Sequence, residues 1–185
     1  MKKHLYFGTG LVLLVACVQS CSTAEERTYS RWGLEVAVPK GWAPTDETYV
    51  GNDSYYITFS QLDENSSGIT SFSWSLGEVD LVKSVEPFKE VINEDFEDPT
   101  VRPLEKDYGE HETYSIEYSF TFEGTPYRVR IHAFHLANCT VNVLEQSVLT
   151  DSNVIAPDLA AFRKTFRLTD PTTLYNDDIG PLHRR

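Results

Sequence analysis

The residues whose types and spacing suggest chemistry lie mainly in the second half of the chain. Arg128, Arg130 and His132 alternate along one predicted strand, so their side chains share a face. In a chain with a formal net charge of −12, such a basic stripe suits the binding of a partner's carboxylates. The competing interpretation is that the arginines pair with Glu117 and its neighbours on the adjacent strand. The stripe therefore predicts cross-strand ion pairing first, with an anion-binding patch for a partner as the functional alternative.

The other polar residues do not form a catalytic or metal-binding pattern. His132 and His135 are three residues apart on a strand, so they face opposite ways and cannot hold one metal ion. Residues 63–68 match the first half of an EF-hand loop, but Trp74 occupies the position that requires a glutamate. Cys139 lies in an apolar strand pattern and is expected to be a buried thiol, not a nucleophile paired with His135. We therefore expect no catalytic residue, no metal and no cofactor.

Aromatic residues surround a segment rich in turn-forming residues, 43–54. Their number and position indicate a small-ligand pocket, which is the alternative to a protein-binding role. The rings expected to line this pocket belong to Trp32, Trp42, Tyr55 and Tyr56.

Residues 1–21 have the organisation of an export signal. A short basic start precedes an apolar run of about a dozen residues, whereas a helix that spans a bilayer needs about 20. Leu14-Val15-Ala16-Cys17 resembles the lipobox of bacterial lipoproteins, in which the cysteine receives the lipid. Val18-Gln19-Ser20-Cys21 is a poorer match because Gln19 is bulky and polar. We therefore expect export and lipid anchoring to the bacterial cell envelope through Cys17, with Cys21 as the alternative.

The acidic charge of the chain restricts its partners. Removal of Lys2 and Lys3 with the export signal takes the net charge from −12 to −14. A chain of this charge repels the phosphates of nucleic acids, so no nucleic-acid partner is expected. The expected contacts are the membrane, through the lipid anchor, and a protein partner. A mature chain of about 160 residues suits a single domain.

Hydrophobic periodicity predicts the elements that position these residues. Alternation indicates strands at 34–38, 55–61, 69–76, 114–122, 127–137 and 139–146, with a shorter strand at 101–104. Helical spacing predicts one helix capped by Ser84, with Pro87 in its first turn, and a final helix opened by Pro157. Residues 43–54 are expected to be a loop. This order predicts an α+β fold in which helices cover both faces of an antiparallel sheet of about six strands, an α/β/α sandwich.

Residues 29–42 contain a tyrosine-rich lead, the first predicted strand and the turn Pro39-Lys40-Gly41-Trp42, and the last helix ends in Ala161-Phe162-Arg163-Lys164-Thr165-Phe166. These two segments resemble the PsbP-like superfamily, which includes the photosystem II extrinsic subunit, the Ran-binding Mog proteins and DcrB-like envelope lipoproteins. The resemblance implies a PsbP-like domain at 29–168. Polar composition predicts a linker before it at 22–28, and polar composition with two prolines predicts a flexible tail after it at 169–185. Because of the export signal, the envelope lipoprotein branch fits best, and the resemblance brings no catalytic residues. We expect a non-catalytic module that binds a protein or stabilises an assembly.

Overall fold

The structure is a computed structural model that describes residues 27–50, 54–63, 67–105 and 108–169. The expected export signal, with Cys17 and Cys21, and residues 170–185 of the expected tail lie outside the described residues. Within the described ranges, no helix is long and apolar enough to cross a membrane. The elements in chain order are β1 (Arg27–Arg31), β2 (Leu34–Val38), β3 (Trp42–Val50), β4 (Ser54–Gln61), β5 (Ile69–Leu76), α1 (Leu81–Asp95), β6 (Glu97–Pro103), β7 (Tyr114–Phe122), β8 (Thr125–Leu136), β9 (Cys139–Val148), a 3-10 turn (Leu149–Asp151), α2 (Ser152–Thr165) and β10 (Arg167–Leu168).

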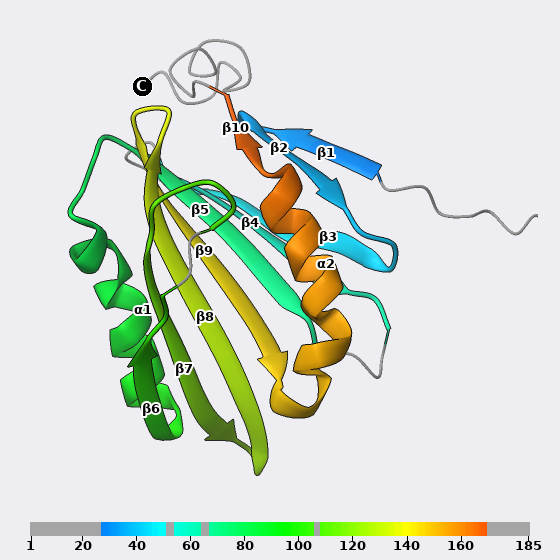
Figure 1. Cartoon of the computed structure of the whole chain (residues 1–185), viewed down its shortest axis with the longest axis vertical. Helices are drawn as coiled ribbons and strands as arrows, with labels where there is room; N and C mark the ends of the chain where they lie inside the picture. Colours follow the sequence, from blue (N-terminus) through cyan, green and yellow to red (C-terminus); the bar gives the residue numbers. More distant parts are fainter. Residues whose placement is uncertain (1–26, 51–53, 64–66, 106–107, 170–185) are drawn as a thin grey trace, which may run out of the picture.

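A seven-stranded antiparallel sheet is the centre of the fold (Figure 1). Its strand order is β3-β4-β5-β9-β8-β7-β6. The three consecutive strands β3, β4 and β5 form one group, β7, β8 and β9 form another, and the two groups meet where β5 pairs with β9. Helix α1 and strand β6 connect the two groups along the chain. A smaller sheet has the order β1-β2-β10. The predicted α+β class with an antiparallel sheet is confirmed, with seven strands in the main sheet instead of about six.

The two faces of the main sheet are covered by different elements. Val129, Ile131 and Ala133 of β8 form a core with α1. Phe134, which follows in the opposite orientation, belongs to a larger core that includes α2, β2 and β10. Helices α1 and α2 therefore lie on opposite faces, as the predicted sandwich requires, and the small sheet lies on the α2 side (Figure 1).

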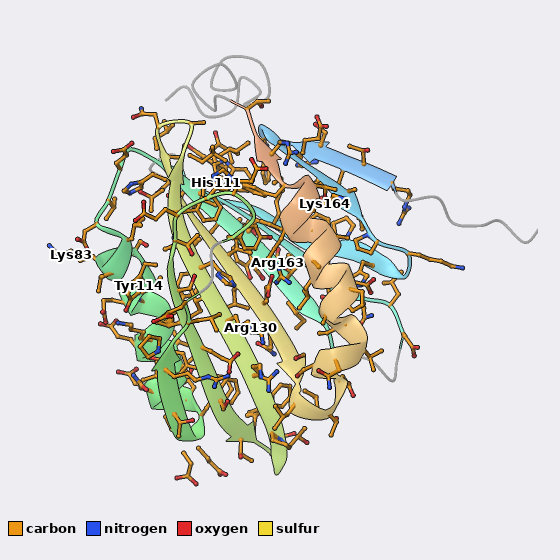
Figure 2. All side chains as sticks on the ribbon, viewed as in Figure 1. Lys83, His111, Tyr114, Arg130, Arg163 and Lys164 are labelled. Carbon is orange, nitrogen blue, oxygen red and sulfur yellow. The ribbon has the colours of Figure 1, made fainter. Side chains whose placement is uncertain are left out.

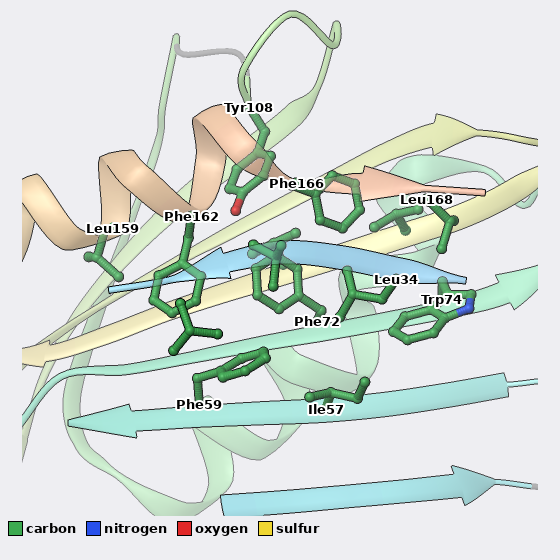
Figure 3. Close-up of a cluster of buried hydrophobic side chains, with 14 of the residues drawn as sticks. Leu34, Ile57, Phe59, Phe72, Trp74, Tyr108, Leu159, Phe162, Phe166 and Leu168 are labelled. Carbon is green, nitrogen blue, oxygen red and sulfur yellow. The ribbon is translucent and has the colours of Figure 1, made fainter. Parts of the chain in front are cut away.

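Aromatic side chains dominate the larger core (Figure 3). Phe162 of α2 is fully buried, and its ring centroid lies 5.2 Å from that of Trp42 and 5.3 Å from that of Phe59. Phe72 and Phe166 stack at 5.3 Å. Burying one such ring stabilises the fold by about 1.5–3 kcal/mol. These contacts hold α2 against strands β3, β4 and β5, in the half of the sheet next to the strands that carry the charged residues described below.

Helix α1 begins earlier than the sequence pattern indicated. Asp80 caps it by accepting a hydrogen bond from the backbone N–H of Lys83 at 3.0 Å. The expected cap, Ser84, lies inside the helix and donates to Leu81 O and Asn142 Oδ1, so that prediction was wrong. Pro87 consequently lies beyond the first turn. The expected apolar stripe is present, because Val85 and Ile92 are buried against the sheet.

The predicted start of the last helix was also wrong. Helix α2 begins at Ser152, so Pro157 lies inside the helix and does not open it. The short 3-10 turn that precedes Ser152 leads directly from β9 into α2. The apolar stripe was predicted correctly, since Ile155, Leu159 and Phe162 are all buried.

Most of the segment predicted to be a loop, 43–54, is a strand. Strand β3 pairs with β4 at the edge of the sheet, with an irregularity between Pro44 and Asp46. An edge strand tolerates proline because only one of its sides needs backbone hydrogen bonds. The sequence pattern did not identify β3 as a strand, because its polar residues lack the apolar alternation that an exposed edge strand does not need.

Candidate functional site: an arginine-rich face of the sheet

Charged residues form a row across four neighbouring strands on the α2 side of the sheet. Arg102 of β6 is opposite Glu117 of β7, which is opposite Arg130 of β8, and Arg130 is opposite Glu145 of β9. Side chains at paired positions point to the same face, so the row alternates in sign. Arg128 lies two residues from Arg130 on the same face. We call Arg102, Arg128, Arg130 and Glu117 the arginine face.

Glu117 is the carboxylate around which the three arginines gather, and it is only 3% exposed. Arg130 Nε donates to Glu117 Oε2 at 2.8 Å, and Arg102 Nε donates to Glu117 Oε1 at 3.0 Å. Arg128 Nε lies 3.8 Å from Oε1, which is ion-pair distance without a hydrogen bond. Burial opposes the charge of Glu117, but the hydrogen bonds from Arg130 and Arg102 and the charges of Arg130 and Arg128 outweigh it and lower its pKa. The carboxylate is therefore ionised at neutral pH.

Glu145 forms a second, more deeply buried group with helix α2. Arg163 Nη1 donates to Glu145 Oε2 at 2.7 Å, and Glu145 is 2% exposed. His132 Nε2 lies 4.0 Å from the same oxygen, and His132 Nδ1 lies 2.8 Å from Ser115 Oγ. The Tyr108 side chain is also fully buried there, and burial together with the negative charge of Glu145 raises its pKa well above the ordinary value.

The three residues of the expected anion patch, Arg128, Arg130 and His132, differ in their exposure to solvent. Arg128 and Arg130 have side chains that are 26% and 24% exposed, and that of Arg102 is 67% exposed. His132 is fully buried and does not belong to the surface patch, which corrects that part of the prediction. It shares the arginines' face, but it lies where that face is covered. Figure 2 shows Arg130 on the sheet and Arg163 extending from α2 toward the same region.

The arginine face has a surplus of positive charge. Its three guanidinium groups share one carboxylate, and the predicted cross-strand pairing with Glu117 is present. Among the described residues no acceptor bonds to Arg128 Nε. Arginine donors match carboxylates in geometry, so this local excess of positive charge in a chain of net charge −12 is chemically able to pair with further carboxylates.

Three residues of this region, Arg102, Glu145 and Arg163, were not singled out by the sequence pattern. Glu145 occupies a position that alternation assigns to the buried face of β9, alongside Val141 and Val143. A charged residue in phase with core positions is the signal that identifies it. Arg163 could not be found in this way, because the sequence pattern of α2 does not show which strand residues the helix contacts in the folded protein.

The four rings of the expected ligand pocket do not line a common cavity. Trp42 is 1% exposed and donates through Nε1 to Asp158 Oδ2 at 2.8 Å. Tyr55 is also buried, next to Trp32, and their ring centroids are 5.5 Å apart. Tyr56 points to the opposite face of β4, where its hydroxyl donates to Ser71 Oγ. Trp42 pairs with Gln61, at the other end of β4 from Tyr55 and Tyr56. The rings pack the core and the sheet surface separately.

Cys139 and His135 lie on different faces of the sheet, so they do not form a catalytic pair. The side chain of Cys139 is fully buried, as predicted. His135 is exposed on the α1 side, with Nε2 at 2.8 Å from Val79 O.

Comparison with known proteins identifies the fold. No family model matches the sequence, and no curated protein matches it. Among solved structures, the chain is similar to cyanobacterial PsbP (CyanoP) from Synechocystis sp. PCC 6803, with 13% identity and a TM-score of 0.52, over 82% of this chain and 99% of that chain. It is also similar to LpqN, described as involved in cell envelope biogenesis of Mycobacterium tuberculosis, with 12% identity and a TM-score of 0.49, over 74% of this chain and 83% of that chain. The similarity to CyanoP confirms the predicted PsbP-like fold.

Proposed function

We propose that this PsbP-like domain is a non-catalytic protein-binding module, exported and lipid-anchored in the bacterial cell envelope. Its arginine face binds an acidic segment of a protein partner. The lipid attaches to Cys17, with Cys21 as the alternative, and tethers the folded domain to the membrane.

The excess of guanidinium groups around Glu117 carries this proposal. Three arginines share one carboxylate, and their side chains remain between 24% and 67% exposed. A purely structural ion pair would need one arginine, which Arg130 supplies at 2.8 Å. Arg102 and Arg128 add charge and donors at the solvent side, where an incoming carboxylate meets several preoriented guanidinium groups. Elsewhere the acidic surface repels such a segment, so charge directs the partner to this face.

The binding test uses Arg102→Gln combined with Arg128→Gln in the lipidated protein. Arg130 is kept, because it holds the buried carboxylate of Glu117. The matched control is Lys40→Gln with Lys83→Gln, which removes the same charge from exposed positions elsewhere. Native membranes are cross-linked gently, and the partner recovered with the wild type is quantified for each variant.

We expect the arginine double variant to lose about tenfold in partner recovery at subsaturating protein, which corresponds to about 1.4 kcal/mol. The lysine control is expected to recover the partner as the wild type does. Equal losses in both variants would show that overall charge matters and the arginine face does not. The proposal fails if the arginine variant, folded and anchored, recovers the partner at the wild-type level.

The anchor has a separate test by mass spectrometry of the mature N-terminus. We expect a diacylglyceryl-modified Cys17, or Cys21 if the second cleavage site is used. An unmodified N-terminus beyond Cys21 would contradict lipid anchoring and leave the binding proposal standing.

A further inference from the structure

A pocket lined mainly by aromatic rings lies on the α1 side of the sheet, the face opposite the arginine face. It has a volume of about 380 Å³. We call it the aromatic pocket, and its lining residues are Asp95, Phe96, Phe120, Phe122, Tyr127 and Gln146. Phe96 ends helix α1, while the other rings come from the β7–β8 hairpin.

The four rings of the aromatic pocket support one another. Phe96 stacks on Phe120 with centroids 4.1 Å apart and meets Phe122 edge-on at 5.6 Å. Tyr127 completes the group, at 5.8 Å from Phe120 and 6.5 Å from Phe122. Phe120 is buried, whereas Phe122 is 45% exposed. The pocket therefore has a fixed floor and an open ring at its edge, so a side chain can enter without the core unfolding.

The electrostatic surroundings of these rings are negative. The last turn of α1 contains no basic residue and ends in Glu94 and Asp95. Carbonyl groups at a helix C-terminus already carry partial negative charge, so these carboxylates add to an unfavourable potential that a nearby cation would relieve. Exposed Glu97 and Asp98 follow Phe96 directly, and exposed Glu123 follows Phe122 in the hairpin turn.

Ring faces and carboxylates together favour a cation over an anion or a neutral apolar group. The negative faces of aromatic rings attract ammonium and guanidinium groups. Within the part of the chain that the structure describes, the cations found over rings are elsewhere, with Arg31 over Trp32 and Lys89 over Tyr114. Asp95 at the rim can receive the charged end of a side chain whose methylene groups lie along Phe122 and Tyr127.

We propose that the aromatic pocket binds a lysine or arginine side chain in a basic segment of a protein partner. The aliphatic stem packs on the exposed rings, and the cation lies between the ring faces, the C-terminal end of α1 and Asp95. This site goes beyond the proposed function, because it lies on the other face of the sheet and binds the opposite charge. Either site can fail its test without deciding the other.

The test is a titration followed by NMR, with the mature chain and two defined peptides. One peptide is acetyl-Gly-Lys-Gly-Lys-Gly-amide, and the other replaces each lysine with norleucine, which keeps the stem and removes the charge. We expect the lysine peptide to bind weakly and to shift the ring signals of Phe122 and Tyr127. The norleucine peptide is expected to bind at least about threefold more weakly.

Three variants locate the binding. Phe122→Leu keeps an apolar side chain but removes the exposed ring, and it is expected to weaken lysine-peptide binding about threefold. Asp95→Asn is expected to weaken binding about twofold, an effect that salt should diminish. Glu35→Gln, an exposed change on β2, is the matched charge control and is expected to leave binding unchanged.

Three results would each overturn the proposal. One is norleucine-peptide binding as strong as lysine-peptide binding, which would make the pocket simply apolar. Another is an equal loss with Glu35→Gln and Asp95→Asn, which would reduce the effect to overall charge. The third is no shift of the ring signals. If Phe122→Leu proves unstable, the peptide comparison and Asp95→Asn still decide the matter.

Discussion

Replacing Glu117 with glutamine tests how the arginine face is held together. Glutamine keeps the shape and one acceptor oxygen but removes the charge shared by Arg102, Arg128 and Arg130. One charge-assisted hydrogen bond is lost, worth about 1.5–3 kcal/mol. Removing one partner from a fully buried ion pair costs about 3–5 kcal/mol, but these arginines are 24–67% exposed and water solvates them again. We therefore expect the free energy of unfolding to fall by about 2 kcal/mol at neutral pH.

The pH dependence separates the lost charge from a packing defect. The pKa of Glu117 is lowered in the folded protein, so ionised Glu117 stabilises the fold above the ordinary glutamate pKa. This contribution disappears as the pH falls through the lowered folded-state value. The difference between wild type and Glu117→Gln, measured by urea unfolding, should therefore be about 2 kcal/mol at about pH 7 and become progressively smaller at acidic pH, below the ordinary glutamate pKa. The exposed control Glu35→Gln should change stability by less than about 0.5 kcal/mol at either pH. A difference that stays constant with pH would refute the electrostatic explanation.

Two further predictions concern the larger core. Trp42→Phe removes the 2.8 Å hydrogen bond to Asp158 and part of a buried ring. The free energy of unfolding, measured by urea titration, should therefore fall by about 1–3 kcal/mol. A loss below about 0.5 kcal/mol would contradict the assigned contact. Cys139 is fully buried, so a thiol reagent should not label it in the native protein but should label it in urea. Peptide mapping after treatment measures both. Rapid labelling of the native protein would contradict the prediction by showing that the thiol is accessible.

The alternation in the sequence predicted which face of the sheet each side chain occupies better than it predicted how far other elements cover that face. Alternation correctly placed His132 on the same face as Arg128 and Arg130. Alternation could not show that His132 is fully covered while the Arg130 side chain stays about a quarter exposed, because the position of α2 depends on distant contacts such as those of Phe162. For the same reason, the ion pair between Arg163 and Glu145 could not be predicted from the sequence.

Element boundaries were hardest to predict where the stabilising group is small or the strand is exposed. Asp80 caps α1 through one hydrogen bond to Lys83 N, and Ser84 was an equally plausible cap by residue type. Strand β3 contains Pro44 and polar residues because it is an edge strand, so its composition resembles that of a loop. The long alternating strand β7, with Ile116, Tyr118 and Phe120 buried on one side, was predicted correctly at both ends.

The central claim, that the arginine face is the surface that binds a protein partner, is tested most directly by site-specific photo-crosslinking in the native envelope. A photoreactive residue at Thr121, on the arginine side of β7, is compared with one at Ser73, on the opposite side of β5. We predict that Thr121 cross-links to one protein, and that Arg102→Gln with Arg128→Gln abolishes this product. Equal cross-linking from both positions, or a Thr121 product that persists in the double variant, would contradict the account.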